Sequence, residues 1–379
     1  MKNIVVLGAG LVGKAIILDL YKSYNVHVID IDKDNLSEFK DVPNITTTVT
    51  DLAVDANIKK SVKDADLVIG AVPGFMGFNM LKNVIESGKN IVDISFFPED
   101  PFELDKLAKD NNVTAVVDCG VTPGMGNIIL GHYLNKIDIS SYKCLVGGLP
   151  QNPVKPWGYK AVFSPIDVIE EYTRPVRFRK NGKMEIEDAI SKSELVEFDN
   201  IGQFEAWNTD GLRTLLSTTN IPNLVELTIR YIDTIEPVKA LRDSGFFSAE
   251  AIDVKGKKVR PIDFTTNLMF AQWKLQPNEK DMTLMRIIIE GVKNGEPHKV
   301  TYDLVDFFDS KTNTTSMART TGYTCTAVAN LLLENKYNAN GIIAPEYLGK
   351  DESAFQYIVN YLAKRNIIYQ KSKHDESEH

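Results

Sequence analysis

Three glycines near the start of the chain have the spacing that brings a backbone close to a phosphate group. Gly8, Gly10 and Gly13 stand in the stretch VVLGAGLVGKAIILDL, between a strand-like run and a helix expected to begin near Leu11. Gly8 would permit a tight turn, Gly10 would let a pyrophosphate approach the backbone, and Gly13 would let the helix pack closely on the strand. The first N–H groups of the helix, at Leu11 and Val12, would face the anion.

An acidic residue follows at the position where a dinucleotide site needs one. The second strand-like run, VHVID, ends at Asp30, 20 residues after Gly10. A carboxylate there can hold the hydroxyls of the adenosine ribose and would repel a 2′-phosphate, so we predict NAD rather than NADP as the cofactor. Lys33 lies close enough to keep this preference moderate. The alternative is a Rossmann-like domain that has lost its nucleotide.

The ends of two later strand-like runs are expected to complete the cofactor site, because ligands of such sheets bind beyond the carboxyl ends of the strands. LVIG is followed by Ala71, Val72 and Pro73, and NIVDIS ends at Ser95. Ala71 and Val72 are small and apolar, which suits the neighbourhood of a nicotinamide, and Ser95 could form a hydrogen bond with its carboxamide. Plain turn chemistry is the alternative at each position.

Asp118 is the candidate for acid–base chemistry. It ends the run TAVVD immediately before CGVTPGMGN, a loop in which Gly120, Pro123 and Gly124 specify an unusual backbone path ahead of a helix. A carboxylate there would face the crevice in which substrate meets the nicotinamide, and partial burial would raise its pKa towards useful proton transfer. We therefore predict a catalytic role for Asp118. The alternative is a carboxylate that braces the loop.

Arg213 is the candidate receptor for a carboxylate of the substrate. The stretch FEAWNTDGLRTLLST places Asp210 at an expected strand-to-helix turn and Arg213 in the first turn of the helix. A cation there opposes the helix dipole, which indicates a bound anion, and a guanidinium beside free helix N–H groups can hold a carboxylate at two points. A structural salt bridge from Arg213 to Asp210 or a neighbouring acid is the alternative.

The elements that must position these residues divide the chain in two. In the first third, short apolar runs alternate with helical stretches, which predicts a Rossmann-type, doubly wound parallel sheet with helices on both faces. After Gly120 the pattern changes to loops and hairpins, with Asn181-Gly182 and Asn294-Gly295 placed as two-residue turns. The expected fold class is therefore α/β, with a second α+β domain built on a largely antiparallel sheet.

Helical patterning returns from about Ser316, and we expect this tail to pack back on the first domain. The expected dinucleotide-binding domain covers residues 1–122 and is completed by 318–379. The expected second domain covers residues 123–317.

Composition narrows the class of ligand. Among the 379 residues, 43 Lys and Arg stand against 51 Asp and Glu, and this net charge of −8 argues against nucleic acid as a partner and favours small solutes. The cysteines, Cys119, Cys144 and Cys325, lie far apart, so neither a disulfide framework nor a metal site is indicated.

No apolar run approaches the ~20 residues that span a bilayer, and the strand-like opening leaves no room for a signal peptide. We therefore expect a cytoplasmic protein with no membrane partner.

A series of motifs resembles one known family along nearly the whole chain, from Met1 to about Tyr369. In order, they are GAGLVGKA, VIGAVPGFMGF, VDISFFPEDPFEL, DCGVTPGMGNIILG, VGGLPQNP, FSPIDVIEEYTRPVR, EAWNTDGLRTLL, LRDSGFF and SMARTTGYTCTAVANLLL. The series resembles the saccharopine dehydrogenase superfamily, and most closely its L-lysine 6-dehydrogenase branch. Taken together, these motifs are far more specific than the glycine pattern alone.

The resemblance implies an NAD-dependent oxidation of the side-chain amine of L-lysine or a lysine-like amino acid. Hydride would pass from the ε-carbon to the nicotinamide, and water would convert the resulting imine to the semialdehyde, which cyclises to a piperideine carboxylate. By position, Asp118 matches the part of the family that lines the substrate crevice, and Arg213 matches an arginine suited to the α-carboxylate. The substrate-binding residues expected on this basis are Cys119, Gly120, Pro123, Gly124, Asn127 and Asp210. The second domain would hold substrate and help to form a homodimer.

The sequence departs from the family pattern at one place. Family members commonly carry Pro-Gly-His after an LR pair and an aromatic residue, whereas here Arg230-Tyr231 is followed by Ile232-Asp233-Thr234. This departure favours, as one alternative, a nucleotide-binding regulator without catalysis.

The other alternative is an enzyme that cleaves or forms a secondary amine, as saccharopine reductases do. Such an enzyme needs cations to bind the second, dicarboxylic half of its substrate. Arg174, Arg177 and Arg179 could supply these cations. Alternation in RPVRFRK, however, puts Arg177 and Arg179 on one strand face, which we expect to be solvated.

Overall fold

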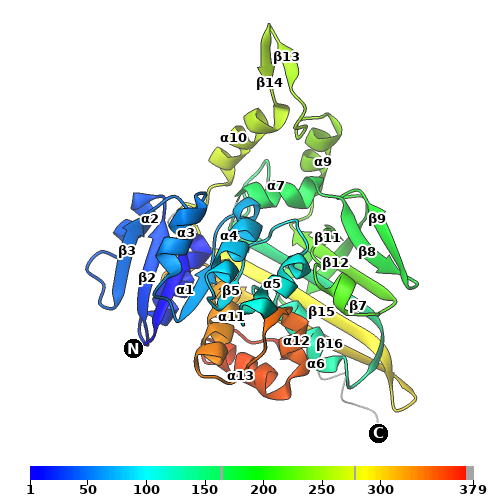
Figure 1. The fold of residues 1–379 in the computed structure, drawn as a ribbon. Helices are drawn as coiled ribbons and strands as arrows, with labels where there is room; N and C mark the ends of the chain where they lie inside the picture. The colour runs from blue at the N-terminus through cyan, green and yellow to red at the C-terminus, as the bar shows by residue number, and fades with distance from the viewer. Residues whose placement is uncertain (163–164, 277–278, 373–379) are drawn as a thin grey trace. The chain divides into compact units, whose positions relative to one another are not determined.

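The computed structural model describes residues 1–162, 165–276 and 279–372 (Figure 1). They form two compact units. The first comprises Met1–Ile137 and Met317–Ile368, and the second comprises the described residues of Asp138–Ser316 and of 369–372. The first unit therefore extends beyond residue 122 and includes a helix, Met125–Tyr133, that we expected in the second domain.

The first unit is built on a seven-stranded parallel sheet. Its strands are β1 (Asn3–Leu7), β2 (Asn25–Asp30), β3 (Ile45–Val49), β4 (Leu67–Gly70), β5 (Ile91–Asp93), β6 (Thr114–Val116) and β17 (Gly341–Ile343). The spatial order is β17-β6-β5-β4-β1-β2-β3. Chain order thus reverses between β1 and β4, and ligands of doubly wound sheets bind at this switch point.

Five of these strands are predicted from the sequence, and β3 and β17 are not. The predicted strands β1, β4, β5 and β6 are almost entirely buried runs of apolar residues, as expected for strands covered on both faces. β3, with the sequence ITTTV, is instead an exposed edge strand. β17 has three residues and joins the sheet from a distant part of the chain.

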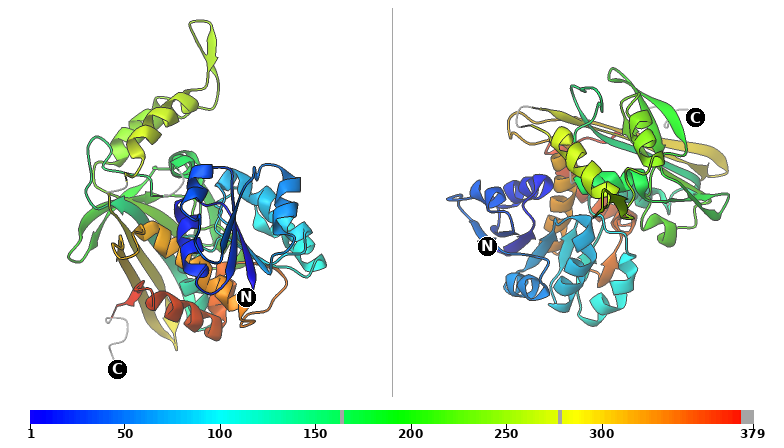
Figure 2. Two further views of the ribbon diagram at one scale, coloured as in Figure 1. Left: turned by 90° about the vertical axis from the view of Figure 1, so that its left-hand side faces the viewer. Right: turned by 90° about the horizontal axis from the view of Figure 1, so that it is seen from above.

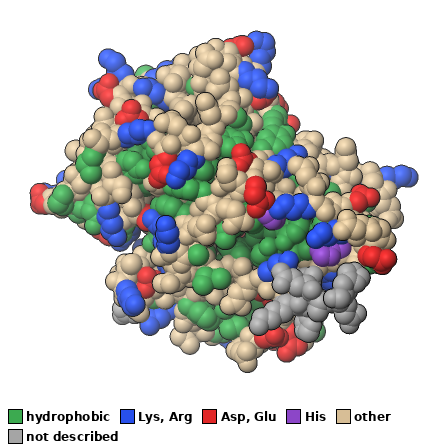
Figure 3. Space-filling view, turned by 90° about the horizontal axis from the view of Figure 1, so that it is seen from below, with side chains coloured by type: hydrophobic (Ala, Val, Ile, Leu, Met, Phe, Trp, Pro, Cys, Tyr) green, Lys and Arg blue, Asp and Glu red, His purple; other side chains and the backbone are tan. Residues whose placement is uncertain are grey.

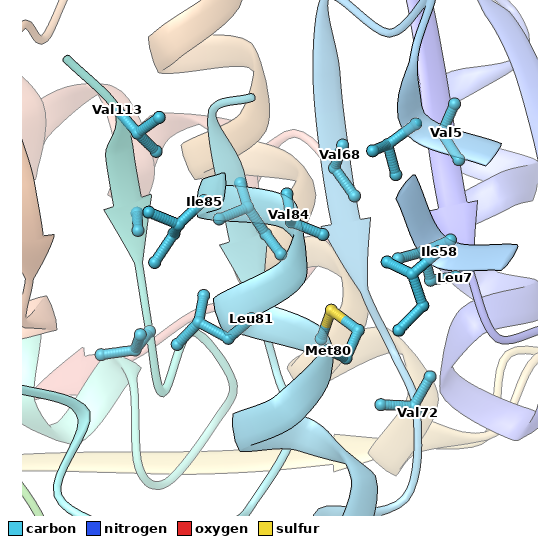
Figure 4. Close-up of a cluster of buried hydrophobic side chains, with 14 of the residues drawn as sticks. Val5, Leu7, Ile58, Val68, Val72, Met80, Leu81, Val84, Ile85 and Val113 are labelled. Atoms are coloured by element: carbon cyan, nitrogen blue, oxygen red, sulfur yellow. The ribbon is translucent and has the colours of Figure 1, made fainter. Parts of the chain in front are cut away.

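Helices cover both faces of this sheet (Figures 1 and 2). They are α1 (Leu11–Leu20), α2 (Lys33–Ser37), α3 (Asp55–Val62), α4 (Gly74–Glu86), α5 (Asp105–Asp110), α6 (Met125–Tyr133), α11 (Ser316–Leu333), α12 (Pro345–Lys350) and α13 (Glu352–Ala363), with a 3-10 turn at Pro101–Leu104. On one face, Met80, Leu81, Val84 and Ile85 of α4 pack with Val68 of β4 and its neighbours (Figure 4). Their spacing places these four residues on one side of the helix.

The C-terminal helices belong to the first unit because they pack on its first helix. Thr326 of α11 and Tyr361 of α13 both donate side-chain hydrogen bonds to the Oδ2 atom of Asp19 in α1, across 2.6 and 2.7 Å. Arg365 donates to the other oxygen of Asp19 across 2.8 Å. This partly buried polar network fixes the tail against the helix that follows the glycine-rich turn.

The second unit is built on a nine-stranded sheet. The main path runs β10-β11-β12-β7-β15-β16-β18, β8 also pairs with β12, and β9 pairs with β8. All of these pairs are antiparallel except that of β7 with β12, so the largely antiparallel sheet expected from the sequence is confirmed. The strands are β7 (Asp138–Pro150), β8 (Val176–Lys180), β9 (Lys183–Glu187), β10 (Ser193–Phe198), β11 (Gly202–Asn208), β12 (Asn223–Arg230), β15 (Asp281–Lys293), β16 (Glu296–Phe307) and β18 (Gln370–Lys371).

Both predicted two-residue hairpin turns are present. Asn181 and Gly182 join β8 to β9 with φ of 49° and 77°, and Asn294 and Gly295 join β15 to β16 with φ of 54° and 89°. Positive φ at both turn residues matches the twist of the flanking strands and explains the Asn-Gly sequence. The unit also contains α7 (Pro165–Thr173), α8 (Leu215–Thr218), α9 (Ile235–Asp243), α10 (Pro261–Trp273) and a separate hairpin of β13 (Ile252–Val254) and β14 (Lys257–Val259).

Candidate functional site

The glycine-rich turn after β1 is built so that two of its glycines cannot carry a side chain. Gly8 has φ of 106°, and a Cβ added there would lie 2.3 Å from the carbonyl oxygen of Ala71. A Cβ on Gly13 would lie 2.3 Å from the carbonyl oxygen of Gly8. Gly10 is different, because a Cβ there would meet no atom within 4 Å. Gly8 and Gly13 therefore close the turn, while Gly10 leaves open space beside the backbone.

The start of α1 offers donors to an anion in that open space. Gly10 is the residue before the helix and supplies no side-chain cap, and the first turn contains no acidic residue. Leu11 is 49% exposed, so the first turn of the helix reaches the surface of the unit. The free N–H groups and the positive end of the helix dipole fit a pyrophosphate.

Asp30 is held at the end of β2 by the same turn. Its Oδ2 atom accepts a hydrogen bond from the Ala9 N–H across 2.6 Å, and its Oδ1 atom accepts one from the Asp32 N–H across 2.7 Å. Each carboxylate oxygen can accept a further hydrogen bond. Asp30 is therefore oriented beside the glycine-rich turn, as a residue that holds ribose hydroxyls must be, and the residues present fit a dinucleotide.

Of the three residues that follow β4, two lie at the surface of the first unit and one lies in its core. The Ala71 N–H donates to the Leu7 carbonyl across 2.8 Å, which ties this segment to the end of β1. Ala71 is partly exposed and Pro73 is exposed. Val72 instead belongs to the hydrophobic cluster beneath α4, near Met80 (Figure 4). The structure thus places the Val72 side chain in the core, and its expected place beside the nicotinamide stays a prediction.

Ser95 has a partner inside the first unit. It is 3% exposed, and its hydroxyl donates to the Oδ1 atom of Asp93 across 2.8 Å. A Cβ on Gly77 of α4 would lie 2.7 Å from the Ser95 Cβ, so the helix lies tightly against it. The Ser95 hydroxyl therefore has a hydrogen-bond acceptor within its own turn. A hydrogen bond from Ser95 to the cofactor stays a prediction.

The backbone path around Asp118 is as unusual as the sequence indicates. Asp118 has φ of 52°, in the left-handed region, and is 1% exposed, which is deeper burial than expected. The Gly120 N–H donates to the Pro123 carbonyl across 3.1 Å, which closes the loop on itself. Gly124 has φ of 138°, and a Cβ there would lie 1.9 Å from the Gly120 carbonyl oxygen. This loop presents Asp118 beside Cys119, whose N–H donates to the Asp93 carbonyl across 2.9 Å.

Two of the expected substrate-binding residues, Asn127 and Cys119, are buried within the first unit, and their roles toward a substrate stay predictions. Asn127 donates from Nδ2 to the Oε2 atom of Glu346 across 3.2 Å, and its side-chain oxygen accepts from the Gly124 N–H across 3.4 Å. Asn127 thus braces the loop against α12. Burial and the carboxylates of Asp93 and Asp118 raise the pKa of the Cys119 thiol far above its usual range, so this thiol stays protonated.

The local structure predicted at Arg213 is wrong. The next helix along the chain is α8, which has four residues and begins at Leu215, after Arg213. Arg213 lies in the preceding turn with φ of 50° and is 7% exposed. The argument from the dipole of a helix therefore does not apply to Arg213, although its guanidinium remains a cation on the loop after β11.

Asp210 is bound by an arginine from another strand. Arg177 of β8 donates from Nε to Oδ1 across 2.9 Å and from its terminal nitrogen to Oδ2 across 2.7 Å. Arg179, two residues on, donates to the backbone carbonyls of Leu216 and Thr219. Both arginines are therefore bound to protein groups, while the Arg177 side chain is still 41% exposed, so this face is solvated only in part.

Sequence reasoning missed Glu226, a buried acid at the middle of β12. It is 4% exposed, and the Thr209 hydroxyl donates to its Oε2 atom across 2.6 Å. Burial, helped by the charges of Glu171 and Asp210 and opposed by the Thr209 hydrogen bond, raises its pKa to about 8. The signal was available in the sequence, because Glu226 interrupts an apolar strand between Val225 and Leu227.

The residues described contain no helix long and apolar enough to cross a membrane. Within the same residues there is no group of three or more His, Cys, Asp or Glu side chains placed to hold a metal ion. On the face drawn in Figure 3, basic and acidic side chains are interspersed.

Comparison with known families covers nearly the whole chain. Residues 4–116 match the saccharopine dehydrogenase NADP binding domain, and residues 120–368 match the saccharopine dehydrogenase C-terminal domain. The chain belongs to the saccharopine dehydrogenase family. The family assignment made from the sequence motifs is confirmed at this level, whereas the L-lysine 6-dehydrogenase branch is not distinguished.

Members of the saccharopine dehydrogenase family are similar to this chain at low identity. The mitochondrial alpha-aminoadipic semialdehyde synthase of Rattus norvegicus is 24% identical, and the match covers 91% of this chain but 45% of the rat protein. The saccharopine dehydrogenase [NADP(+), L-glutamate-forming] of Pyricularia oryzae is 26% identical over 66% of this chain and 59% of its own length. The chain spans less than half the length of the rat relative.

Two further proteins match along nearly their full length. The carboxyaminopropylagmatine dehydrogenase of a Synechocystis strain is 22% identical, with 93% of this chain and 94% of that protein covered. The apo structure of saccharopine dehydrogenase (L-Glu forming) from Saccharomyces cerevisiae has a TM-score of 0.79 and 20% identity, and covers 98% of this chain and 99% of its own. The yeast structure shows that this fold is that of a saccharopine dehydrogenase.

Proposed function

We propose that this protein is an NAD-dependent dehydrogenase that oxidises the side-chain amine of L-lysine or a lysine-like amino acid. The observation that carries the proposal is the fit of Gly10, α1 and Asp30 to a dinucleotide in a chain of the saccharopine dehydrogenase family. When bound, NAD would supply the acceptor for a hydride. The three buried free cysteines suit a reducing compartment, and we place the reaction in the cytoplasm.

The choice of NAD over NADP rests on Asp30. Its carboxylate stands beside the glycine-rich turn and is held there through the N–H groups of Ala9 and Asp32. A 2′-phosphate at the same place would meet a fixed negative charge. The matching family domain and several relatives carry NADP in their names, so the cofactor preference is a specific point on which this chain is proposed to differ.

Three arginines of the second unit bear on whether the site could hold a substrate larger than lysine. A secondary amine with a second dicarboxylic half needs extra cations. Arg174 forms an ion pair with Glu170, Arg177 binds Asp210, and Arg179 binds backbone carbonyls. These three side chains are already bound to protein groups, which supports the smaller, lysine-like substrate.

A second candidate is the oxidative cleavage of a secondary amine such as saccharopine. It is favoured by the relatives whose names carry saccharopine as substrate. It would require Arg177, whose side chain is 41% exposed, to exchange part of its contact with Asp210 for a substrate carboxylate.

Two residues are assigned roles in the proposed reaction. Asp118 accepts a proton from the amine, because it is a carboxylate at the end of a parallel strand and a strained loop presents it. Arg213 binds the α-carboxylate through its guanidinium. Arg230 is assigned no role in the reaction, because it is buried in an ion pair with Glu171.

The test is an absorbance assay for reduced nicotinamide. Purified full chain is incubated with NAD or NADP and, separately, with L-lysine, L-ornithine or saccharopine. The proposal predicts turnover with L-lysine and NAD. Turnover with saccharopine alone would select the second candidate, and no turnover with any amine, despite NAD binding measured by calorimetry, would overturn both.

A further inference from the structure

The loop between β11 and α8, residues 209–214, is attached to two strands at its start. Thr209 donates its hydroxyl to the Oε2 atom of Glu226 across 2.6 Å, and its N–H to the Glu226 carbonyl across 3.3 Å. The next residue, Asp210, is held through both of its carboxylate oxygens by Arg177. The first two residues of the loop are therefore fixed on β12 and β8.

Gly211 then lies directly on the carboxyl group of Glu226. A Cβ at Gly211 would lie 2.4 Å from the Oε2 atom of Glu226 and 2.5 Å from its Cδ atom. The φ of Gly211 is not positive, so glycine is needed here for space rather than for its backbone conformation. The carboxyl group of Glu226 thus sets how closely the loop can approach β12.

The packing of β12 does not explain why an acid stands at this position. Glu226 is 4% exposed and lies between two apolar residues of the strand. Burying a carboxyl group costs more free energy than burying an apolar side chain. Burial, and then the acidic groups of Glu171 and Asp210, raise the pKa of Glu226, and in the part of the chain that the structure describes it gains no ion pair in return. Its carboxyl group is instead hydrogen-bonded to the loop.

Arg213 follows Gly211 by two residues, in a backbone conformation that needs support. Its φ of 50° lies in the left-handed region, which is unfavourable for a residue other than glycine. Such a conformation persists where the surrounding structure fixes it. The contacts of Thr209 and Gly211 with Glu226 come immediately before Arg213 in the chain. They are placed to fix the direction in which its guanidinium is presented.

We propose that Glu226 is a positioning residue for the substrate: through Thr209 and Gly211, it holds the loop from which Arg213 binds the α-carboxylate. This inference rests on the proposed function, which supplies the ligand of Arg213. Glu226 itself takes no part in the transfer of hydride. Loss of its contacts therefore weakens the binding of substrate and leaves the rate of the chemical step unchanged.

The test compares four variants of the full chain. Glu226→Leu removes the acceptor for Thr209 while filling a similar volume, and Glu226→Gln keeps an oxygen at the same place. Thr209→Val breaks the same hydrogen bond from the side of the loop, and takes the place of Glu226→Leu if that variant does not fold. The matched control is Leu224→Ala, which removes a buried side chain two residues away on the same side of β12. Circular dichroism shows whether each variant folds.

Two quantities are measured: the hydrogen–deuterium exchange of residues 209–214, by mass spectrometry, and the steady-state kinetics with L-lysine at saturating NAD. In Glu226→Leu and Thr209→Val, exchange in the loop is expected to be about tenfold faster and KM for L-lysine about tenfold higher, with kcat within about twofold of wild type. Glu226→Gln should match wild type in both quantities. Leu224→Ala should also match it, although its stability is lower.

Unchanged exchange in Glu226→Leu and Thr209→Val overturns the inference. Faster exchange with an unchanged KM also overturns it, because Glu226 would then support the loop without affecting the substrate. A KM that rises equally in Leu224→Ala assigns the effect to a general loss of packing and overturns the positioning role alone. Wild type that oxidises no L-lysine overturns the proposed function, and this role of Glu226 with it.

Discussion

Thr209 donates its side-chain hydroxyl to the Oε2 atom of Glu226 across 2.6 Å, and both residues are buried in the second unit. Gly211 makes this contact possible, because a Cβ there would lie 2.4 Å from the same oxygen. The pair anchors the loop that carries Asp210 and Arg213 to strand β12. Glu226 is thus a buried acid that positions a candidate substrate loop.

The first prediction concerns the pH dependence of stability at Glu226. The folded chain keeps this carboxyl protonated up to a pKa of about 8, whereas an unperturbed glutamate loses its proton near 4.5. Between these values the unfolded state binds fewer protons, so the free energy of unfolding falls as pH rises from about 4.5 to about 8. Glu226→Gln keeps an acceptor for Thr209 and removes the titration.

The measurement is denaturant unfolding of wild type and Glu226→Gln between pH 5 and pH 8. We expect the variant to gain stability relative to wild type as pH rises, on the order of a few kcal/mol over the whole interval. Titrations shared by the two proteins cancel in this difference. A difference that stays constant with pH would contradict a neutral, buried Glu226.

The second prediction separates the two kinds of glycine in the turn after β1. Gly8→Ala is expected to lower the free energy of unfolding by about 2 to 4 kcal/mol, because the new Cβ meets a backbone carbonyl at positive φ. Gly10→Ala meets no atom, so its stability should change by less than about 1 kcal/mol. Its affinity for the dinucleotide should fall at least tenfold, as measured by calorimetry. Equal effects of both variants on stability would refute this division of roles.

These glycines also show what a sequence can predict about this site. The turn, Asp30 and the loop after Asp118 are local structures, because the residues that shape them lie within a few positions of one another. Their backbone requirements are therefore visible as glycine, proline and aspartate at fixed spacing. Among β1 to β6, the strands that are buried on both faces can also be predicted, because each is a continuous run of apolar residues. The exposed edge strand β3 has no such run and could not be predicted.

The partners of buried polar groups could not be predicted in the same way. Asp210 is bound by Arg177, 33 positions earlier, and Asn127 by Glu346, 219 positions later. No local sequence pattern indicates which distant side chain forms a hydrogen bond with a buried carboxylate or amide. The helical propensity of LRTLLST likewise does not decide the local structure at Arg213, which adopts φ of 50° in the left-handed region.

The third prediction concerns cofactor choice at Asp30. Asp30→Asn keeps one accepting oxygen and removes the charge, so NAD should bind more weakly while NADP binds more strongly. The ratio of the two dissociation constants should shift by about tenfold, which corresponds to about 1.4 kcal/mol. Asp34→Asn, an exposed acid in the first turn of α2, is the control and should leave the ratio unchanged. Titration calorimetry with both dinucleotides gives the answer, and an unchanged ratio in Asp30→Asn would exclude the charge as the cause of preference.

The fourth prediction tests proton transfer at Asp118. Asn has nearly the same shape and tolerates the left-handed backbone that Asp118 adopts at φ of 52°. Asp118→Asn should therefore lower kcat by about 10²- to 10⁴-fold with little change in unfolding free energy. Asp41→Asn, at an exposed residue with φ of 65°, is the matched control and should affect neither quantity. A destabilised Asp118→Asn variant with normal kcat would instead indicate a carboxylate that only braces the loop.

The central claim is that hydride leaves the side-chain carbon that bears the amine of a lysine-like substrate and is accepted by NAD. The most direct test uses L-lysine carrying two deuterium atoms on the ε-carbon, with mass spectrometry of the reduced cofactor after a single turnover. We predict one deuterium in each molecule of NADH formed, and none when the label is placed on the α-carbon. Unlabelled NADH from the ε-labelled substrate, or no NADH at all, would contradict the account.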